Sequence, residues 1–308
     1  MRIATAHAYD ASLASLQKRQ QQLSEAQQQL TSGKRVLRPS DDPAAAAVAE
    51  RALAAASRSD TQMRALDASR FAMQLTESAL GESGELLQQA RELVVSAGNS
   101  TFTDAERLDL AERLRGLRGA LFAVGNRSDG AGRYLFGGQS SDGPPLLDGP
   151  GGVSFNGVAG QADAAADRAM PLSADGRAIW LLASDPANPA QSLSVFDAMD
   201  RLVDDLATAG RTPAQVAQTV SLGLAEIDAS AATLSAGRSR AGETLNRLDA
   251  LGSRLSQDKL DAQQARSEAE DLDMVQAISD FQNRQTGYQA ALQTYSIVQR
   301  MSLFDYLR

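Results

Sequence analysis

The sequence predicts a mainly α-helical fold: a long antiparallel helical rod, packed like a coiled coil, formed by the N- and C-terminal halves, with a small β-rich outer domain inserted between them. Three observations support this fold class. Aromatic residues make up only 5% of the 308 residues, apolar residues repeat at heptad spacing in both halves, and glycine and proline gather between about 130 and 190. Long helices packed on one another have this composition and spacing.

The overall charge and the missing residue types limit the classes of function. A net charge of −8 gives no basic surface for nucleic acid. Because there is no cysteine, disulfides and thiolate metal or redox sites are excluded. The N-terminal residues lack the apolar region of a cleaved signal peptide, and no apolar run is long enough to span a membrane. We therefore expect a soluble chain that stays in the cytoplasm or leaves it by a route without leader cleavage.

The first forty residues predict a helix that pairs along one seam. Apolar residues and two glutamines alternate at spacings of three and four, at Ala6, Tyr9, Leu13, Leu16, Gln20, Leu23, Gln27 and Leu30. The glutamines weaken this seam, because a buried amide must find hydrogen-bond partners. Gly33 predicts the end of the helix, since glycine favours the left-handed conformation of a C-cap.

A connector, SGKRVLRPSDDP at residues 32–43, separates this helix from a second one. Pro39 disfavours helical angles at the arginine before it, and Pro43 is expected at the first position of the new helix. The capping side chain is one of three, Ser40, Asp41 or Asp42. The second helix is expected to end at about Ala97. Its seam repeats every seven residues, at Leu66, Met73, Leu80, Leu87 and Val94.

The middle of the chain predicts a third helix and then an insertion. Thr103 and Glu106 have the spacing of a capping box, so a helix is expected from there to about Asn126. Between 130 and 190, β-prone runs such as VSFNGV and RAIWLLA lie among Gly/Pro turns and predict a small β-rich region. Helix resumes after Ser194.

The segment that begins at Thr212 and Pro213 predicts one long helix. From Val220 to Leu255, apolar or small residues alternate at spacings of four and three without a change of phase. A hairpin broken at SAGRSRAG is the alternative, since each helical glycine costs about 1 kcal/mol, but the preserved phase favours a continuous helix. Over 213–258 it would be about 69 Å long. A compact chain of this size is about 50 Å across, so we expect a rod.

The chain ends in a second seam. Residues 259–273 are polar and interrupt the heptad pattern, which returns in another phase at Met274, Ile278, Phe281, Gln285, Tyr288, Leu292, Tyr295 and Gln299. The simplest arrangement pairs the two ends of the chain. We therefore predict three domains: a terminal axial helical pair (1–40 with 260–308), a helical rod domain (41–132 with 190–259) and a small β-rich outer domain (133–189).

No catalytic, cofactor-binding or metal-binding residues are predicted. His7 is the only histidine, and an exposed helical position explains it better than a catalytic triad or a metal site. The glycines of GAGRYLFGG lack a phosphate-loop lysine and do not open a helix, so we interpret them as turn residues. Asn99 and Asn126 match the glycosylation acceptor pattern, which often occurs by chance. We expect no enzyme and no cofactor.

The remaining candidates are surfaces for protein partners. The last eight residues, MSLFDYLR, are largely apolar, although chain ends are normally frayed and polar. Because both terminal seams are weak, we expect them to order when the chain assembles with partners. The predicted assembly interface comprises Leu13, Leu16, Leu23, Leu30, Ile278, Phe281, Tyr288, Leu292, Tyr295, Leu303 and Phe304.

Three stretches resemble bacterial flagellins, and most closely the hook-filament junction proteins of the flagellum. LTSGKRVLRPSDDPAAAAVAERAL at 30–53 resembles the Leu-Ser/Thr-Ser-Gly, arginine-rich, Asp-Asp-Pro/Ala stretch of these proteins. GRYLFGG resembles the junction proteins' signature at the entry to the outer domain, and DFQNRQTGYQAALQTYSIVQRMSLFDYL resembles their C-terminal helix and its end. Residues 150–190 match only loosely, and the outer domain looks small.

The resemblance implies a structural role outside the cell. Subunits would be exported through the flagellar type III apparatus without leader cleavage. They would form a ring in the axial structure of the bacterial flagellum, between the first hook-associated junction protein and flagellin. It also implies a cytoplasmic export chaperone that holds the last helix, which we place at Met274, Ile278, Phe281, Tyr288, Leu292 and Tyr295. No nucleic acid and no membrane insertion are expected.

The same resemblance suggests a role for the connector. It would separate the axial domain from the rod domain and contribute contacts to neighbouring subunits, with Arg35, Arg38, Pro39, Asp41, Asp42 and Pro43 as candidates. The alternative is that these residues are only helix caps and solvated charges. Two other functions stay open: a flagellin filament subunit, and a secreted helical coiled-coil adaptor.

Overall fold

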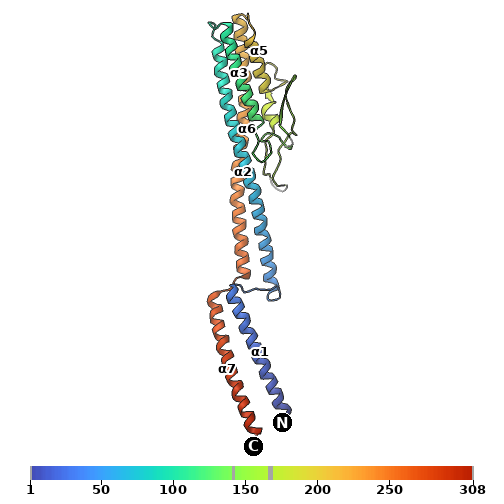
Figure 1. Ribbon diagram of the computed structural model, residues 1–308, viewed down its shortest axis with the longest axis vertical. Helices are drawn as coiled ribbons and strands as arrows, with labels where there is room; N and C mark the ends of the chain where they lie inside the picture. The colour runs from blue at the N-terminus through green and yellow to red at the C-terminus, as the bar shows by residue number, and fades with distance from the viewer. Residues whose placement is uncertain (1, 141–142, 166–168, 307–308) are drawn as a thin grey trace. The chain divides into compact units, whose positions relative to one another are not determined.

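The computed structural model describes the backbone of residues 2–140, 143–165 and 169–306, and the side chains of 2–9 and 298–306 are outside the description (Figure 1). The chain divides into two compact units, 1–60 with 256–308 and 61–255. Seven helices are present in the described residues, with two small two-stranded sheets, so the fold is mainly α-helical as predicted. None of the described helices combines the length and apolar character that a membrane span requires.

The helix boundaries follow the caps that the sequence predicts. Helices α1 (Arg2–Ser32), α2 (Pro43–Ala97) and α3 (Asp104–Gly125) end or begin at the expected residues. Gly33 has a φ of 70°, which suits a glycine C-cap. Thr103 and Glu106 form the reciprocal bonds of a capping box, and Asp42 caps α2 by accepting a hydrogen bond from the Ala45 N–H at 3.0 Å.

Helix α6 (Pro213–Glu270) is very long, and the sequence predicted the loss of its heptad pattern too early. It passes through the SAGRSRAG stretch without a break, which confirms the continuous helix. It also continues through the polar segment 259–270, where we expected the pattern to be lost. Ala262 and Ala269 are buried there and extend the seven-residue repeat of Leu248 and Leu255. A methyl group gives a weak hydropathy signal, so a seam of alanines escapes notice in the sequence.

Helices α2 and α6 pack along matching heptad seams. On α2 the seam residues at seven-residue spacing are buried, namely Ala52, Ser59, Leu66, Met73, Leu80, Leu87 and Val94. Within 61–255, ion pairs flank the seam: Arg70 with Asp249 at 2.8 Å and Arg238 with Glu77 at 2.6 Å. Such flanking pairs help to select one register of two paired helices.

The largest hydrophobic core lies where α3 and α5 (Val195–Ala207) join α2 and α6 (Figure 1). Trp180, at the end of the short α4 (Gly176–Trp180), is almost completely buried in it. Its ring meets Phe136 edge-on at 5.3 Å between centroids and stacks on Phe196 at 5.9 Å. The inserted region is therefore anchored to the helices by aromatic packing.

The inserted region contains little regular β-structure. Strands β1 (Leu146–Gly149) and β2 (Gly152–Phe155) form an antiparallel hairpin, and β3 (Ala183–Ser184) pairs with β4 (Ser192–Leu193). In the remainder of the inserted region, segments of backbone lie directly against one another. Gly138 has a φ of 67°, and a Cβ there would lie 1.9 Å from the Val158 carbonyl oxygen, so only glycine fits. Gly132 and Gly138 both have a positive φ, which supports the turn role predicted for these glycines, and Gly138 also allows the close approach to Val158.

Candidate assembly interface

Helices α1 and α7 (Met274–Tyr306) lie side by side and antiparallel, as the paired seams predict (Figure 1). Between the described side chains the contacts are few. Arg284 on α7 donates a hydrogen bond from Nη1 to the Gln22 carbonyl oxygen on α1 at 3.2 Å. Among the described side chains of the pair, only Leu16 and Ala26 of α1 are buried. The helix pair therefore lacks the packed core that the other unit has.

The predicted interface residues are largely accessible in this pair. Leu13, Met274, Ile278 and Leu292 are each at least 40% exposed, and the half-buried ones are Leu23, Leu30, Phe281, Tyr288 and Tyr295. Leu303 and Phe304 lie within α7, but their side chains are outside the description. The seam pattern missed Val275, at 83% exposure, and Ile297, at 54%. Both residues lie off the heptad positions. An apolar side chain on the face that the seam leaves out is the sequence signal that could have identified them.

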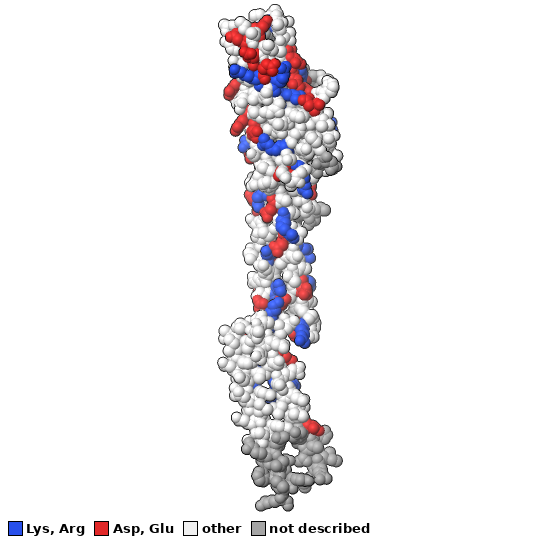
Figure 2. Space-filling model, in the orientation of Figure 1, with Lys and Arg blue, Asp and Glu red and all other residues white. Residues whose placement is uncertain are grey.

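The same surface carries few charges. Between 10 and 32 the charged residues are Asp10, Lys18, Arg19 and Glu25, and between 274 and 297 they are Asp280 and Arg284. Figure 2 shows mostly uncharged atoms on the face of this pair that is in view. Exposed apolar side chains on a charge-poor surface mark sites of protein–protein contact more often than free surface.

We define the joint as the two connections that link these helices to their neighbours, residues 33–42 and 271–273. The first connection is held by the predicted aspartates. The carboxylate of Asp41 accepts hydrogen bonds from the N–H groups of Leu37 at 3.1 Å and Arg38 at 2.8 Å. Val36 is buried, while Pro39 and Pro43 are exposed, with Pro43 at the first position of α2.

The two connections are bonded to each other. The N–H groups of Arg35 and Val36 donate to the Glu270 carbonyl oxygen at 2.6 and 3.4 Å, and the Leu272 N–H donates to the Gly33 carbonyl oxygen at 3.0 Å. Lys34 and Asp271 form an isolated antiparallel bridge. Pairing the two ends of the chain places the two predicted breaks beside each other, as the structure has them, but the sequence gave no sign of the individual bonds between them.

Basic side chains of the first connection hold the end of α6. Lys34 Nζ lies 2.7 Å from Glu270 Oε2. The Arg35 guanidinium donates from Nη2 to the Ala269 carbonyl oxygen at 2.9 Å and from Nη1 to Asp42 Oδ2 at 3.1 Å. Cations beside the last carbonyl groups of a helix interact favourably with its dipole.

These contacts shift the pKa values of two carboxyls. The Lys34 ammonium, and then Arg266, lower the pKa of Glu270. The Ala45 N–H, followed by the Arg35 guanidinium, lowers the pKa of Asp42. Both carboxylates are therefore ionised and bonded within the chain. The Arg38 side chain, in contrast, is exposed and makes no ion pair with the described residues.

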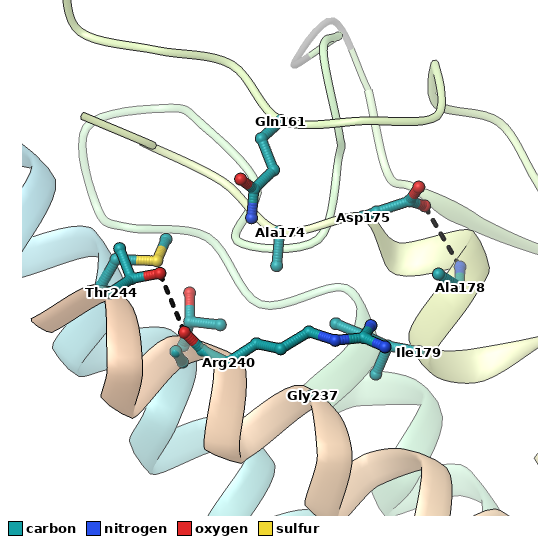
Figure 3. Close-up of a pocket in the computed structure, with 11 residues that line it drawn as sticks. Gln161, Ala174, Asp175, Ala178, Ile179, Gly237, Arg240 and Thr244 are labelled. Atoms are coloured by element: carbon teal, nitrogen blue, oxygen red, sulfur yellow. Dashed lines mark hydrogen bonds between the residues drawn. The ribbon is translucent and has the colours of Figure 1, made fainter. Parts of the chain in front are cut away.

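A cleft of about 60 Å³ lies between the α2–α6 pair and the inserted region (Figure 3). Gln161 points into it from the inserted region, and the Arg240 side chain extends along it toward Ile179. Both carboxylate oxygens of Asp175 already accept hydrogen bonds from backbone N–H groups. Ligand pockets for small molecules usually enclose about 300 Å³ or more, so this cleft is too small for one.

Comparison with known proteins identifies the family. Residues 3–141 match the bacterial flagellin N-terminal helical region, and residues 224–307 match the bacterial flagellin C-terminal helical region. The chain belongs to the flagellin family. The two matches include both helices of the terminal pair and both connections of the joint, so the candidate interface of this flagellin-family chain lies in the part that defines the family.

Individual relatives differ in how much of the chain they match. Flagellar hook-associated protein 3 of Escherichia coli (strain K12) is 28% identical over 317 residues, which is 99% of either chain. Flagellin E of Vibrio cholerae is 34% identical over 124 residues, which is 38% of this flagellin-family chain and 31% of that protein. The crystal structure of flagellar hook-associated protein 3 from Legionella pneumophila aligns at a TM-score of 0.61 and 15% identity, covering 71% of this chain and 97% of that one. It shares the fold.

Proposed function

We propose that this flagellin-family chain is a structural protein of the bacterial flagellum, which forms the junction layer between the hook and the filament. One observation carries the proposal. The similarity to hook-associated protein 3 runs along the full length of both chains, whereas the similarity to a flagellin stops at about a third of each. A junction protein and a filament subunit share their terminal helices, so the middle of the chain distinguishes them.

Its partners in this proposal are further copies of itself, the first hook-associated junction protein and flagellin. The terminal pair would supply the contacts through the apolar residues named above. Their exposure supports this role, because Leu13, Ile278 and Leu292 have too few neighbours within their own pair to be buried. A structural role of this kind requires no catalysis and no cofactor.

Before assembly, the same face of α7 would be covered by a cytoplasmic export chaperone, and the chain would leave through the flagellar type III apparatus. The chaperone contacts are proposed at Met274, Ile278, Phe281, Tyr288, Leu292 and Tyr295. The support is that Met274, Ile278 and Leu292 are exposed apolar side chains on a helix with few charges. In water such a face needs either its assembly partners or a temporary substitute.

We also propose three functional domains with the boundaries expected from the sequence, namely 1–40 with 260–308, 41–132 with 190–259, and 133–189. The joint would separate the first from the second. In that setting Arg35, Arg38, Asp41 and Asp42 are candidates for contacts to neighbouring subunits. Because Arg35, Asp41 and Asp42 are already bonded within the chain, Arg38 is the residue best placed for such a contact.

The test is deletion of the gene, followed by electron microscopy of the cell surface and an assay of flagellin in the medium. Hooks without filaments, together with flagellin monomers in the medium, are the expected result. Hooks without filaments and without released flagellin would mean that this chain is the filament subunit. Normal filaments would contradict the junction role and favour an adaptor. Purified protein gives a second check. A filament subunit would extend seeds into long filaments, whereas a junction protein should not.

A further inference from the structure

An arm of the inserted region lies against the α2–α6 pair. We define the arm as residues 161–165 and 169–173, which form two antiparallel segments. Backbone hydrogen bonds join the segments: the Leu172 N–H donates at 2.6 Å and the Ala164 N–H at 2.8 Å to carbonyl oxygens of the opposite segment. These bonds are internal to the arm, so it can move as one piece without losing them.

Met170 fastens the arm to the helices. Its side chain has no exposed surface. It packs into a small cluster whose other buried members belong to α2 and α6, namely Leu66, Ala72, Met73, Leu248 and Leu255. Among the described residues of the arm, Met170 alone is a buried member of this cluster, and the cluster is separate from the large core around Trp180.

One side-chain hydrogen bond adds to this contact. Ser69 of α2 donates from Oγ to the Pro171 carbonyl oxygen at 2.7 Å, and both residues are buried. A buried carbonyl oxygen that loses its donor costs free energy. The bond from Ser69 therefore favours the arm in its place on the helices.

The other end of the arm is fixed to the inserted region. Ser173 Oγ donates to the Gly138 carbonyl oxygen at 2.5 Å, and the Gly160 N–H donates to Asp175 Oδ2 at 3.0 Å. The cleft of about 60 Å³ lies beside this end, where Gln161 points into it (Figure 3). The arm is therefore fixed at one end, and Met170 and the serine bond hold the part beyond it.

We infer that the arm opens independently of the rest of the fold, and that oxidation of Met170 holds it open. In the open state Met170 and Pro171 have left α2 and α6, while the aromatic packing of Trp180 and the remainder of 61–255 stay folded. Opening breaks the contacts of one small cluster and one side-chain hydrogen bond, not those of the large core, so it is a local event. It is a property of the single chain and does not depend on the proposed junction role.

The open arm exposes the Met170 sulfur to oxidants. Hydrogen peroxide transfers one oxygen atom to a thioether sulfur and leaves as water, and the sulfoxide that forms is polar. Three of the seven methionines of the chain, Met63, Met73 and Met170, belong to this cluster or pack against it. Because a polar group without a hydrogen-bond partner is disfavoured in an apolar cluster, the oxidised arm should not close again.

Oxidation of the full-length protein by dilute hydrogen peroxide tests the inference, with the sulfoxide at each methionine measured by mass spectrometry at low conversion. Met199 is the internal control, because Met170 and Met199 are both at 0% exposure but Met199 lies in the large core. We expect Met170 to be oxidised at least about tenfold faster than Met199, since local opening is more frequent than unfolding of the core.

The variant Ser69→Ala should open the arm more often. It leaves the Pro171 carbonyl oxygen without its donor in the closed state, and we expect oxidation of Met170 to become about tenfold faster. Emission from Trp180, the single tryptophan of the sequence, should not change, because its aromatic contacts stay in place. After the peroxide is removed, amide exchange in the arm should remain fast in protein oxidised at Met170.

The matched control is Ser83→Ala. Ser83 is also fully buried on α2, but its Oγ donates within the helix, to the Ala79 carbonyl oxygen at 2.7 Å. This variant should oxidise at Met170 at the wild-type rate. An equal rise in the two serine variants would show that the bond to the arm is not what holds it, and would overturn the inference.

Three further results would also overturn it. Equal oxidation rates at Met170 and Met199 in the wild-type protein would mean that the arm opens only when the whole unit unfolds, and this comparison decides alone if Ser69→Ala does not fold. A change in Trp180 emission as Met170 is oxidised at low conversion would mean that the whole inserted region detaches. Slow amide exchange in the arm after oxidation of Met170 would show that the sulfoxide does not hold it open.

Discussion

Among single residues, Gly223 decides how closely α5 approaches α6. A Cβ at this position would lie 2.1 Å from Cδ2 of Leu202, which is buried in the core. Because extra volume in a packed core forces side chains off their rotamers, we expect Gly223→Ala to lower the free energy of unfolding by about 1–3 kcal/mol. Thermal unfolding followed by circular dichroism measures this.

The matched control for that variant is Gly84→Ala. Gly84 is exposed on α2, and a Cβ there would meet nothing within 4 Å. Alanine is a better helix former than glycine by about 1 kcal/mol, so this variant should be slightly more stable than wild type. If the two variants changed stability in the same direction, close packing at Gly223 would not be the cause.

The carboxyl of Glu226 is buried between α6 and α5. Burial raises its pKa above the ordinary value of 4.5, although Arg201 acts in the opposite direction. Arg201 Nη1 lies 3.2 Å from Glu226 Oε1, yet this oxygen has no hydrogen bond from the described residues. The folded state then binds a proton more tightly than the unfolded state. Stability therefore falls as pH rises from about 4.5 through the raised pKa and levels off above it.

Replacement of this carboxyl should remove that part of the pH dependence. We expect the stability of Glu226→Gln relative to wild type to increase between about pH 4 and pH 7, because wild type pays for ionising a buried carboxyl. Urea unfolding at several pH values measures the difference. Glu85→Gln, an exposed change on α2, is the control. A difference between Glu226→Gln and wild type that stays constant with pH would contradict this explanation.

Among the helices and strands, the β1–β2 hairpin depends on Arg118 of α3. Its Nη2 donates to Asp148 Oδ1 of β1 and to Asp200 Oδ2 of α5, each at 3.0 Å. The guanidinium also lies 5.6 Å from the centroid of the Phe196 ring. One planar guanidinium therefore joins α3, β1 and α5. A lysine ammonium cannot reproduce the hydrogen bonds to both aspartates.

We expect Arg118→Lys to lower the free energy of unfolding by about 1–3 kcal/mol and to increase amide exchange in β1 and β2. Urea unfolding and exchange by mass spectrometry check the two effects. Arg115→Lys, on the same helix, changes an exposed pair with Glu112 and should have little effect. Equal losses in both variants would show that the bridge to the hairpin is unimportant.

Contacts at the end of α3 also explain the glycosylation-like pattern at Asn126. Asn126 matched the glycosylation acceptor pattern, but its Nδ2 donates to the Leu146 carbonyl oxygen at 3.0 Å, and its Oδ1 accepts from the Leu146 N–H at 2.9 Å. The amide is therefore used as an extra backbone partner for β1. Its nitrogen is not free for modification in the folded chain.

For the chain as a whole, the contrast between the two units predicts where proteases cut. The unit 61–255 contains the large hydrophobic core and two smaller buried clusters, whereas the terminal pair has few buried side chains. We expect limited proteolysis of the free protein to remove about the first forty and last forty residues and to leave the remainder, since weakly packed ends open most often. Mass spectrometry of the fragments identifies the cuts. Resistance of both ends would contradict ordering upon assembly.

Sequence patterns predicted most of the helical architecture, because large apolar residues at heptad spacing and polar caps give strong local signals. Leu66 and Leu80 marked the seam of α2, and Thr103 marked the start of α3. The extension of α6 to Glu270 could not be predicted in the same way. Its seam residues there are Ala262 and Ala269, which composition does not distinguish from Ala265 between them, a half-buried residue off the seven-residue repeat.

The candidate site was predictable only in part. The apolar residues of the terminal seams and the helix break at Gly33 could be located from the sequence. The pairing of Lys34 with Glu270 could not, because these residues are 236 positions apart and each is an ordinary surface charge in its own segment. Val275 and Ile297 were missed because a seam pattern selects residues that face a partner helix and omits those that face away.

The pairing of the two connections also limits how the sequence can drift. A residue inserted between Gly33 and Arg35 would carry the guanidinium past the Ala269 carbonyl and shift the bridge to Asp271 by one position. The same disruption would follow an insertion next to Glu270 on the other strand of the bridge. The lengths of the two connections should therefore change together or stay fixed.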